Sequence, residues 1–88
     1  MKKSLIKQGN NCFMCGKYLP LECHHLVFGR YRSLSDKYGL TIMICRACHS
    51  AIHHNKKLMD WSRALGQRVF EKHYGHDRWM KEAGKNFL

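Results

Sequence analysis

The segment CRACHSAIHH, residues 45–54, holds two cysteines and three histidines, the densest group of metal-binding side chains in this chain of 88 residues. Cys45 and Cys48 form a Cys-x-x-Cys pair, whose two thiolates can bind one ion from a single tight turn. His49 and His53 are four residues apart, a spacing that puts both imidazoles on one face of a helix. The segment therefore predicts a metal-binding turn that runs directly into a metal-binding helix.

A second Cys-x-x-Cys pair, Cys12 and Cys15, is separated from the first by 29 residues. Two such pairs present four thiolates, the ligand set of a closed structural zinc site. We expect Zn²⁺ bound by Cys12, Cys15, Cys45 and Cys48 to clamp an inserted hairpin. The ion would supply folding free energy that a core this small lacks. Cys23 lies outside both pairs and is expected to be a small buried apolar residue.

The apolar pattern predicts a small α+β fold in one domain, residues 1–88. The β-branched run LTIMIC, residues 40–45, has the length of a strand. Apolar residues recur at spacings of three and four from Leu58 to Tyr74, which is typical of an amphipathic helix, and Gly75 would end it. The expected elements are a loosely ordered basic arm over residues 1–11, strands over 19–28 and 40–45, a polar loop over 29–39, and helices over 48–55, 58–74 and 77–83.

The chain carries a formal net charge of +10, from 16 Lys and Arg against 6 acidic residues. Such a bias indicates a polyanionic partner, nucleic acid before membrane. No segment approaches the roughly 18 apolar residues of a membrane span, and residues 1–11 lack the apolar run of a signal peptide. We therefore expect a cytoplasmic protein with reduced thiols and no membrane partner, in which paired cysteines bind metal rather than form disulfides.

Contacts to DNA phosphates are expected from Arg30, Arg32 and Lys37 in the polar loop, and from Arg46 beside the metal-binding helix. The alternative for each of these residues is an ordinary solvated surface charge. Phosphate contacts would provide affinity but little sequence reading.

His24 and His25 are neighbours in the first expected strand, so their side chains must point to opposite faces. One of them can join a metal while the other faces a substrate. This division suits phosphodiester hydrolysis, in which a metal stabilises charge on the phosphate and an imidazole takes a proton from the attacking water. Imidazole fits the second task because its pKa is near neutrality.

The first cysteine pair, the segment Glu22-Cys23-His24-His25-Leu26, and the second pair running into His49 and His53 together resemble the HNH endonucleases. The similarity is greatest to the small four-cysteine members found in phages and mobile elements, and it extends from Cys12 to about His54. It implies a zinc-stabilised ββα-metal (HNH, or His-Me finger) core over about residues 12–55, with a helical extension over about residues 56–88.

By position in the motif, the resemblance implies that His25 is the general base, and that His24, His49 and His53 hold a catalytic divalent metal. Three imidazoles favour borderline ions such as Zn, Ni, Co or Mn, and the alternative is Mg, which prefers oxygen ligands and would keep several waters. The implied activity is metal-dependent DNA cleavage, by nicking or by double-strand cutting, in a bacterial or phage-infected cell.

One position departs from the HNH pattern. The Asn that normally begins the second strand and orients the general base is missing from residues 37–41, KYGLT. The remaining candidates for orienting His25 are a backbone carbonyl near Gly39 and the side chains of Ser33, Ser35 and Asp36.

Two other readings stay open. The chain could be a catalytically inactive, zinc-stabilised module that binds DNA or adapts other proteins. Residues 45–49, CRACH, also match a c-type haem site, but that reading requires export and leaves the first cysteine pair unexplained. A homodimer supported by Trp61, Phe70 and Trp79, or a larger phage or host complex, is also open.

Overall fold

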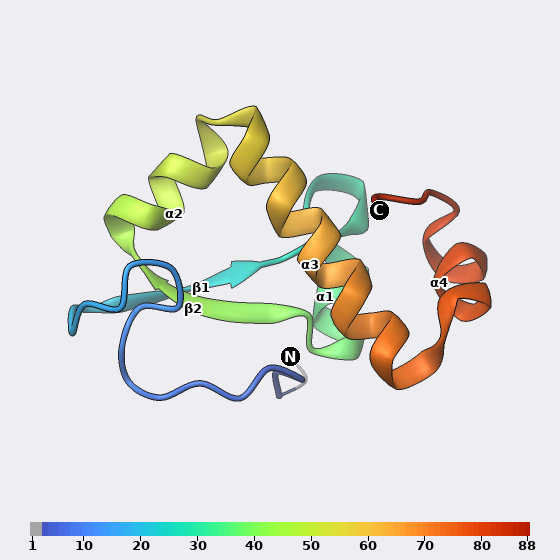
Figure 1. Ribbon diagram of the computed structural model, residues 1–88, viewed down its shortest axis with the longest axis horizontal. Coiled ribbons are helices and arrows are strands. Elements are labelled where there is room, and N and C mark those ends of the chain that lie inside the picture. The colour runs from blue at the N-terminus through green and yellow to red at the C-terminus, as the bar shows by residue number, and fades with distance from the viewer. Residues whose placement is uncertain (1–2) are drawn as a thin grey trace.

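Residues 3–88 are described by the computed structural model, and they form a two-stranded antiparallel sheet with four α-helices (Figure 1). The order is β1 (Leu21–His25), a short 3-10 helix η1 (Gly29–Tyr31), α1 (Arg32–Tyr38), β2 (Thr41–Cys45), α2 (Arg46–His53), α3 (Lys56–Tyr74) and α4 (His76–Ala83). The expected small α+β fold is confirmed. Among the helices of residues 3–88, none is long and apolar enough to cross a membrane.

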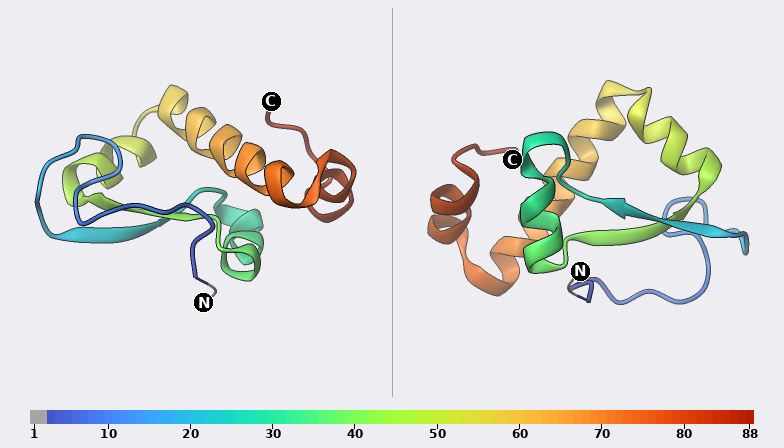
Figure 2. Two further views of the ribbon diagram at one scale, coloured as in Figure 1. Left: turned by 60° about the horizontal axis from the view of Figure 1, so that its bottom comes forward. Right: turned by 180° about the vertical axis from the view of Figure 1, so that it is seen from behind.

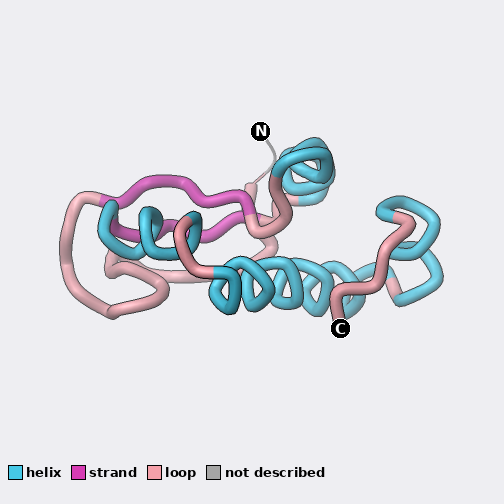
Figure 3. The backbone as a smooth tube through the Cα atoms, turned by 90° about the horizontal axis from the view of Figure 1, so that it is seen from above, coloured by secondary structure: helices cyan, strands magenta, loops and turns pink. Residues whose placement is uncertain are grey.

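The two strands pair in a register that sets His24 opposite Ile42, so both side chains point to the same face of the sheet. Helix α2 begins at the residue directly after β2, without a loop. It folds back across this face of the sheet (Figure 3). Ile42 of β2 and Ile52 of α2 are almost completely buried. Helix α3 continues beside it, and α1 lies at the end of the sheet (Figure 2).

The expectation of a polar loop over residues 29–39 is wrong, because this segment contains η1 and α1. Leu34 and Tyr38 are one helical turn apart and both are buried, so the segment has an apolar face that drives helix formation. The Ser35 hydroxyl donates to the carbonyl of Val27 at 2.7 Å and accepts from the amide of Val27 at 3.1 Å. The amide and the carbonyl of Val27 are thus bonded to α1 instead of β2. Strand β1 ends at His25 and is shorter than the expected strand over residues 19–28.

The N-terminal segment runs along β2, and the expectation of a loosely ordered arm is wrong for residues 3–11. The amide of Leu5 donates to the Gly39 carbonyl at 2.8 Å. The Gln8 side chain bonds both the amide and the carbonyl of Met43, at 2.8 and 3.0 Å, as a neighbouring strand would. Residues 1 and 2, which belong to the same expected arm, lie outside the described residues.

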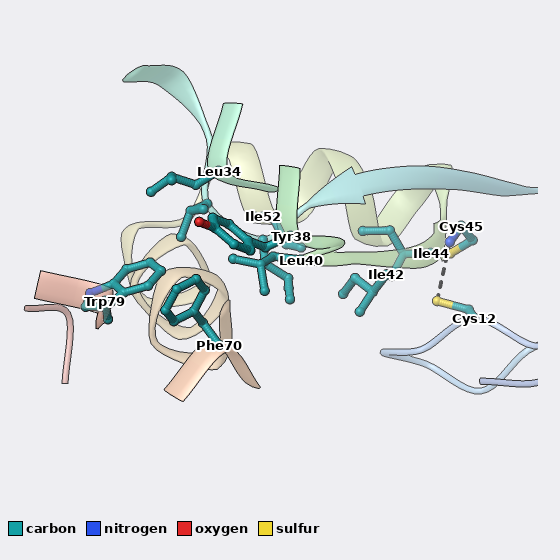
Figure 4. Packing of buried hydrophobic residues seen from close by; sticks show 12 residues of the cluster. Cys12, Leu34, Tyr38, Leu40, Ile42, Ile44, Cys45, Ile52, Phe70 and Trp79 are labelled. Atoms are coloured by element: carbon teal, nitrogen blue, oxygen red, sulfur yellow. Dashed lines mark hydrogen bonds between the residues drawn. The ribbon is translucent and has the colours of Figure 1, made fainter. Parts of the chain in front are cut away.

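The largest buried side chains come from the two C-terminal helices (Figure 4). Phe70 of α3 and Trp79 of α4 are each 0% exposed, with ring centroids 5.3 Å apart. The Trp79 indole also donates to the carbonyl of Lys85 at 2.8 Å, which ties the end of the chain to α4. Phe70 and Trp79 therefore form the core and are not available to support a dimer, whereas Trp61 is partly exposed.

Among the glycines of residues 3–88, Gly39 is the one where an added methyl group would meet the closest contact. It has a left-handed φ of 69°, and a Cβ atom there would collide with the backbone carbonyl of Lys3. We expect Gly39→Ala to lower the free energy of unfolding by more than the roughly 1–2 kcal/mol that left-handed strain alone costs. Thermal or urea unfolding measures the loss.

Gly84→Ala is the matched control, because Gly84 has a similar φ of 72° but open space around it. It should show only the backbone strain. Equal losses in the two variants would contradict the close approach of the N-terminal segment to Gly39.

Candidate metal centres

Four cysteines converge where the N-terminal turn meets the junction of β2 and α2. Cys12 and Cys15 come from a turn, Cys45 is the last residue of β2, and Cys48 lies in the first turn of α2. Their sulfur atoms all lie within 4.8 Å of one another, and the thiols are free. Sulfur atoms around a tetrahedral zinc are about 3.8 Å apart, and the Cys15 and Cys45 sulfurs are separated by 3.9 Å. This cluster can hold a metal ion.

Hydrogen bonds favour a thiolate at Cys12. Burial raises the pKa of Cys12, but backbone amides, including those of Cys15 and Cys45, outweigh it and lower the pKa to about 6. The Cys45 amide lies 3.3 Å from the Cys12 sulfur (Figure 4). Burial and the neighbouring thiols raise the pKa of Cys48 to about 12. The cluster therefore accommodates one negative charge readily and needs a cation before the last thiol ionises.

Three histidines form a second cluster between β1 and α2. His24 comes from the strand, and His49 and His53 come from successive turns of the helix. One ring nitrogen of each lies within 4.8 Å of the others, and the ring centroids are 5.1 to 5.6 Å apart. The spacing of four residues in α2 and the alternation in β1 therefore bring together the three histidines that the sequence selects.

The surroundings of His24 and His53 favour neutral rings. Burial, and then the neighbouring His49 and His53, lower the pKa of His24 to about 4. Burial and His49 also lower the pKa of His53. Imidazole binds metal only when it is unprotonated, so the lowered pKa values of His24 and His53 favour the metal-binding form of these two rings.

Two of these rings are held by hydrogen bonds to residues that the sequence reasoning missed. His24 Nε2 lies 2.8 Å from the Ser62 hydroxyl, and His49 Nδ1 lies 2.9 Å from a carboxylate oxygen of Glu22. Strand alternation could have identified Glu22, because it is two residues before His24. No local pattern points to Ser62, which lies 38 residues from His24.

His25 points away from His24 and contacts α1 instead. Its Nε2 lies 2.8 Å from a carboxylate oxygen of Asp36. Asp36 is one of the residues that the sequence offers for orienting His25, and its carboxylate is the one in contact with the ring.

A cavity of about 340 Å³ brings His25 together with part of the histidine cluster. His25 lines it together with His49 and His53, so a possible proton acceptor and two possible metal ligands face one space. Cys23 also lines this cavity and is partly exposed, so the expectation that it is buried is wrong.

Of the four basic residues expected to contact DNA, the structure brings two to the histidines. Arg32 lines the cavity with His25, and Arg46 lines an adjoining hollow with His49. Arg30 is exposed, with its guanidinium 5.4 Å from the Tyr31 ring centre. Lys37 is directed toward α4, where its ammonium lies 3.9 Å from the Glu82 carboxylate.

Comparison of the chain with protein-family models, with curated proteins and with solved structures gives no match. The geometry of the two clusters is therefore the basis for assigning a function.

Cys15→Ser should remove one equivalent of bound zinc and lower the melting temperature, because it takes one ligand from the cysteine cluster. Cys15 is exposed, so the substitution removes little packing. Elemental analysis and thermal unfolding test this expectation. Cys23→Ser is the control and should keep the metal, so equal zinc content in all three proteins would contradict a four-cysteine site.

His53→Ala should abolish binding of a second divalent ion while the cysteine-bound metal stays in place. His53 is exposed, so the change costs little packing. Calorimetric titration of the zinc-loaded protein with Ni²⁺ measures the second site. His54→Ala, the next residue and also exposed, should bind Ni²⁺ like the wild type, and loss of binding in both variants would contradict the assignment of His53.

Proposed function

We propose that the protein is a metal-dependent DNA endonuclease that hydrolyses phosphodiester bonds, with His25 as the general base. The observation that carries this proposal is the cavity that His25 shares with His49 and His53. Phosphodiester hydrolysis requires a proton acceptor for the attacking water and a cation close to the phosphate. Among the residues that line the cavity, His25 is the candidate proton acceptor, and His49 and His53 are candidate ligands of the cation.

The hydrogen bond to Asp36 supports the role of His25. A carboxylate can only accept, so the ring donates from Nε2 across the 2.8 Å contact. A neutral imidazole has only one N–H, so Nδ1 keeps its lone pair and can take a proton from water. Asp36 in this proposal performs the orienting task of the Asn that the HNH pattern would place before β2.

His24, His49 and His53 are the proposed ligands of the catalytic metal. The donor set fits a borderline divalent ion such as Zn²⁺, Ni²⁺ or Mn²⁺ better than Mg²⁺. When bound, such an ion would stabilise negative charge on the phosphate and the leaving oxygen. The four cysteines would hold a separate structural zinc, because four thiolates close the coordination shell and leave no position for a substrate.

The arrangement of β1, β2 and α2 supports membership of the HNH endonucleases. In this proposal the two antiparallel strands and the helix across one face, with histidines on β1 and α2, are the ββα-metal core that the sequence motif implies. In this proposal α3 and α4 are the helical extension of that core.

DNA is the proposed substrate because the net charge is +10 and two arginines border the histidines. Arg32 and Arg46 would contact phosphates of the bound DNA. Such contacts are independent of base sequence and weaken as salt is added. We therefore expect cleavage with little sequence preference, stronger at low ionic strength.

The deciding experiment is plasmid cleavage by purified protein supplied with Mn²⁺, Ni²⁺ or Mg²⁺. The wild type should nick or linearise the plasmid, and His25→Ala should reduce the rate about 10²- to 10⁴-fold, the usual contribution of a general base. Gel quantification of supercoiled DNA over time measures both proteins.

His73→Ala is the matched control, because His73 is exposed on α3 and bonds only the carbonyl of Val69 in its own helix. It should cleave like the wild type. If the wild type cleaves with none of these ions but still binds DNA, the protein is a zinc-stabilised binding module and the nuclease proposal is wrong.

A further inference from the structure

The histidine cluster receives a contact from α3, a helix outside the segment that resembles the HNH core. Ser62 of α3 is 0% exposed, and its hydroxyl oxygen lies 2.8 Å from Nε2 of His24. The same oxygen lies 2.7 Å from the backbone carbonyl of Leu26. The hydroxyl thus bridges the candidate ligand and the chain that follows β1.

The two distances determine which atom carries each hydrogen. A backbone carbonyl only accepts, so the single hydrogen of the Ser62 hydroxyl is donated to Leu26. The hydroxyl oxygen must then accept from His24, which places the hydrogen of the ring on Nε2. In a neutral imidazole the other nitrogen, Nδ1, keeps its lone pair and is the only ring atom that can bind a metal.

Small residues on α3 make this contact possible. Gly66 lies one turn after Ser62 and is also buried, and a Cβ atom at Gly66 would lie 3.1 Å from the Cβ of Leu26. Helix α3 therefore approaches the end of β1 closely enough for a short side chain to reach His24. A larger residue at either position would move the helix away from the ring.

His49 is held in the same manner by a different partner. The Glu22 carboxylate only accepts, so the 2.9 Å contact places the hydrogen of the His49 ring on Nδ1 and leaves Nε2 free. Hydrogen bonds from metal-binding histidines to such partners select the ring atom that binds the ion and set the ring orientation.

We propose that Ser62 is a positioning residue for the histidine metal site. Its hydroxyl holds His24 as the Nε2-protonated tautomer, so that Nδ1 binds the ion. Helix α3 is then a part of the metal site, beyond its role in the core. This inference rests on the histidine metal site of the proposed function, and it concerns the binding of the ion rather than the cleavage of DNA.

The test compares wild type with Ser62→Ala, both loaded with zinc at the cysteines. Long-range ¹H–¹⁵N NMR of the histidine rings reports the tautomer of His24 before any second metal is added. Calorimetric titration with Ni²⁺ then reports the affinity of the site. We expect an Nε2-protonated ring in the wild type, and in Ser62→Ala a mixed tautomer and a Kd for Ni²⁺ about 10- to 100-fold higher.

Gln67→Ala separates positioning from general destabilisation. Gln67 is also 0% exposed on α3, and its side chain bonds the C-terminal segment at Asn86 and Phe87 instead of a histidine. This variant should lose stability in thermal unfolding yet keep the wild-type tautomer and Ni²⁺ affinity.

A wild-type ring protonated at Nδ1 would overturn the inference, and so would a Ser62→Ala variant whose Ni²⁺ affinity equals that of the wild type. Equal losses of Ni²⁺ affinity in Ser62→Ala and Gln67→Ala would also overturn it, because the effect would then be one of stability. A protein with the expected tautomer and Ni²⁺ affinities that fails to cut DNA would support the role of Ser62 and contradict only the nuclease proposal.

Discussion

The connection between β2 and α2 has no loop, because Cys45 ends the strand and Arg46 begins the helix. At this point the Cys45 amide bonds the Cys12 sulfur, and the Cys45 sulfur belongs to the four-cysteine cluster. A metal held there would link the N-terminal turn, the end of the strand and the first turn of α2. The direction of α2 across the sheet, and with it the position of His49 and His53 opposite His24, depends on this junction.

Strand β1 separates two kinds of chemistry by the simple alternation of its side chains. Glu22 and His24 face α2, where they contact His49 and the rest of the histidine cluster. His25 faces the other way and contacts Asp36 of α1. Because the period of a strand is two residues, a shift of one residue would exchange these roles. The register with β2 therefore keeps His24 on the face of α2 and His25 on the face of α1, while His25 still lines the cavity with His49 and His53.

The helices around the sheet supply partners that hold the histidines in defined orientations. Helix α1 provides Asp36 for His25, and α3 provides Ser62 for His24. Both contacts depend on how these helices pack: Leu34 and Tyr38 anchor α1, and Gly66 permits the close approach of α3. A compact core of this size thus combines stability and site organisation in the same contacts where α3 meets His24 and Leu26, so that substitutions at Ser62 and Gly66 affect both.

The sequence by itself determined the contacts that follow from short spacings. A separation of three residues pairs the cysteines within each turn, a separation of four aligns His49 with His53, and adjacency in a strand divides His24 from His25. Only the tertiary structure decided that residues 29–39 are largely helical, that residues 3–11 lie along β2, and that Asp36, Glu22 and Ser62 contact the histidines. The spacing of Leu34 and Tyr38 is that of a helix with one apolar face. Most of the other residues between Gly29 and Gly39 are polar, and this composition predicted a loop instead. Ser62 gave no signal at all, because its contact with His24 arises from the packing of a distant helix rather than from any local periodicity.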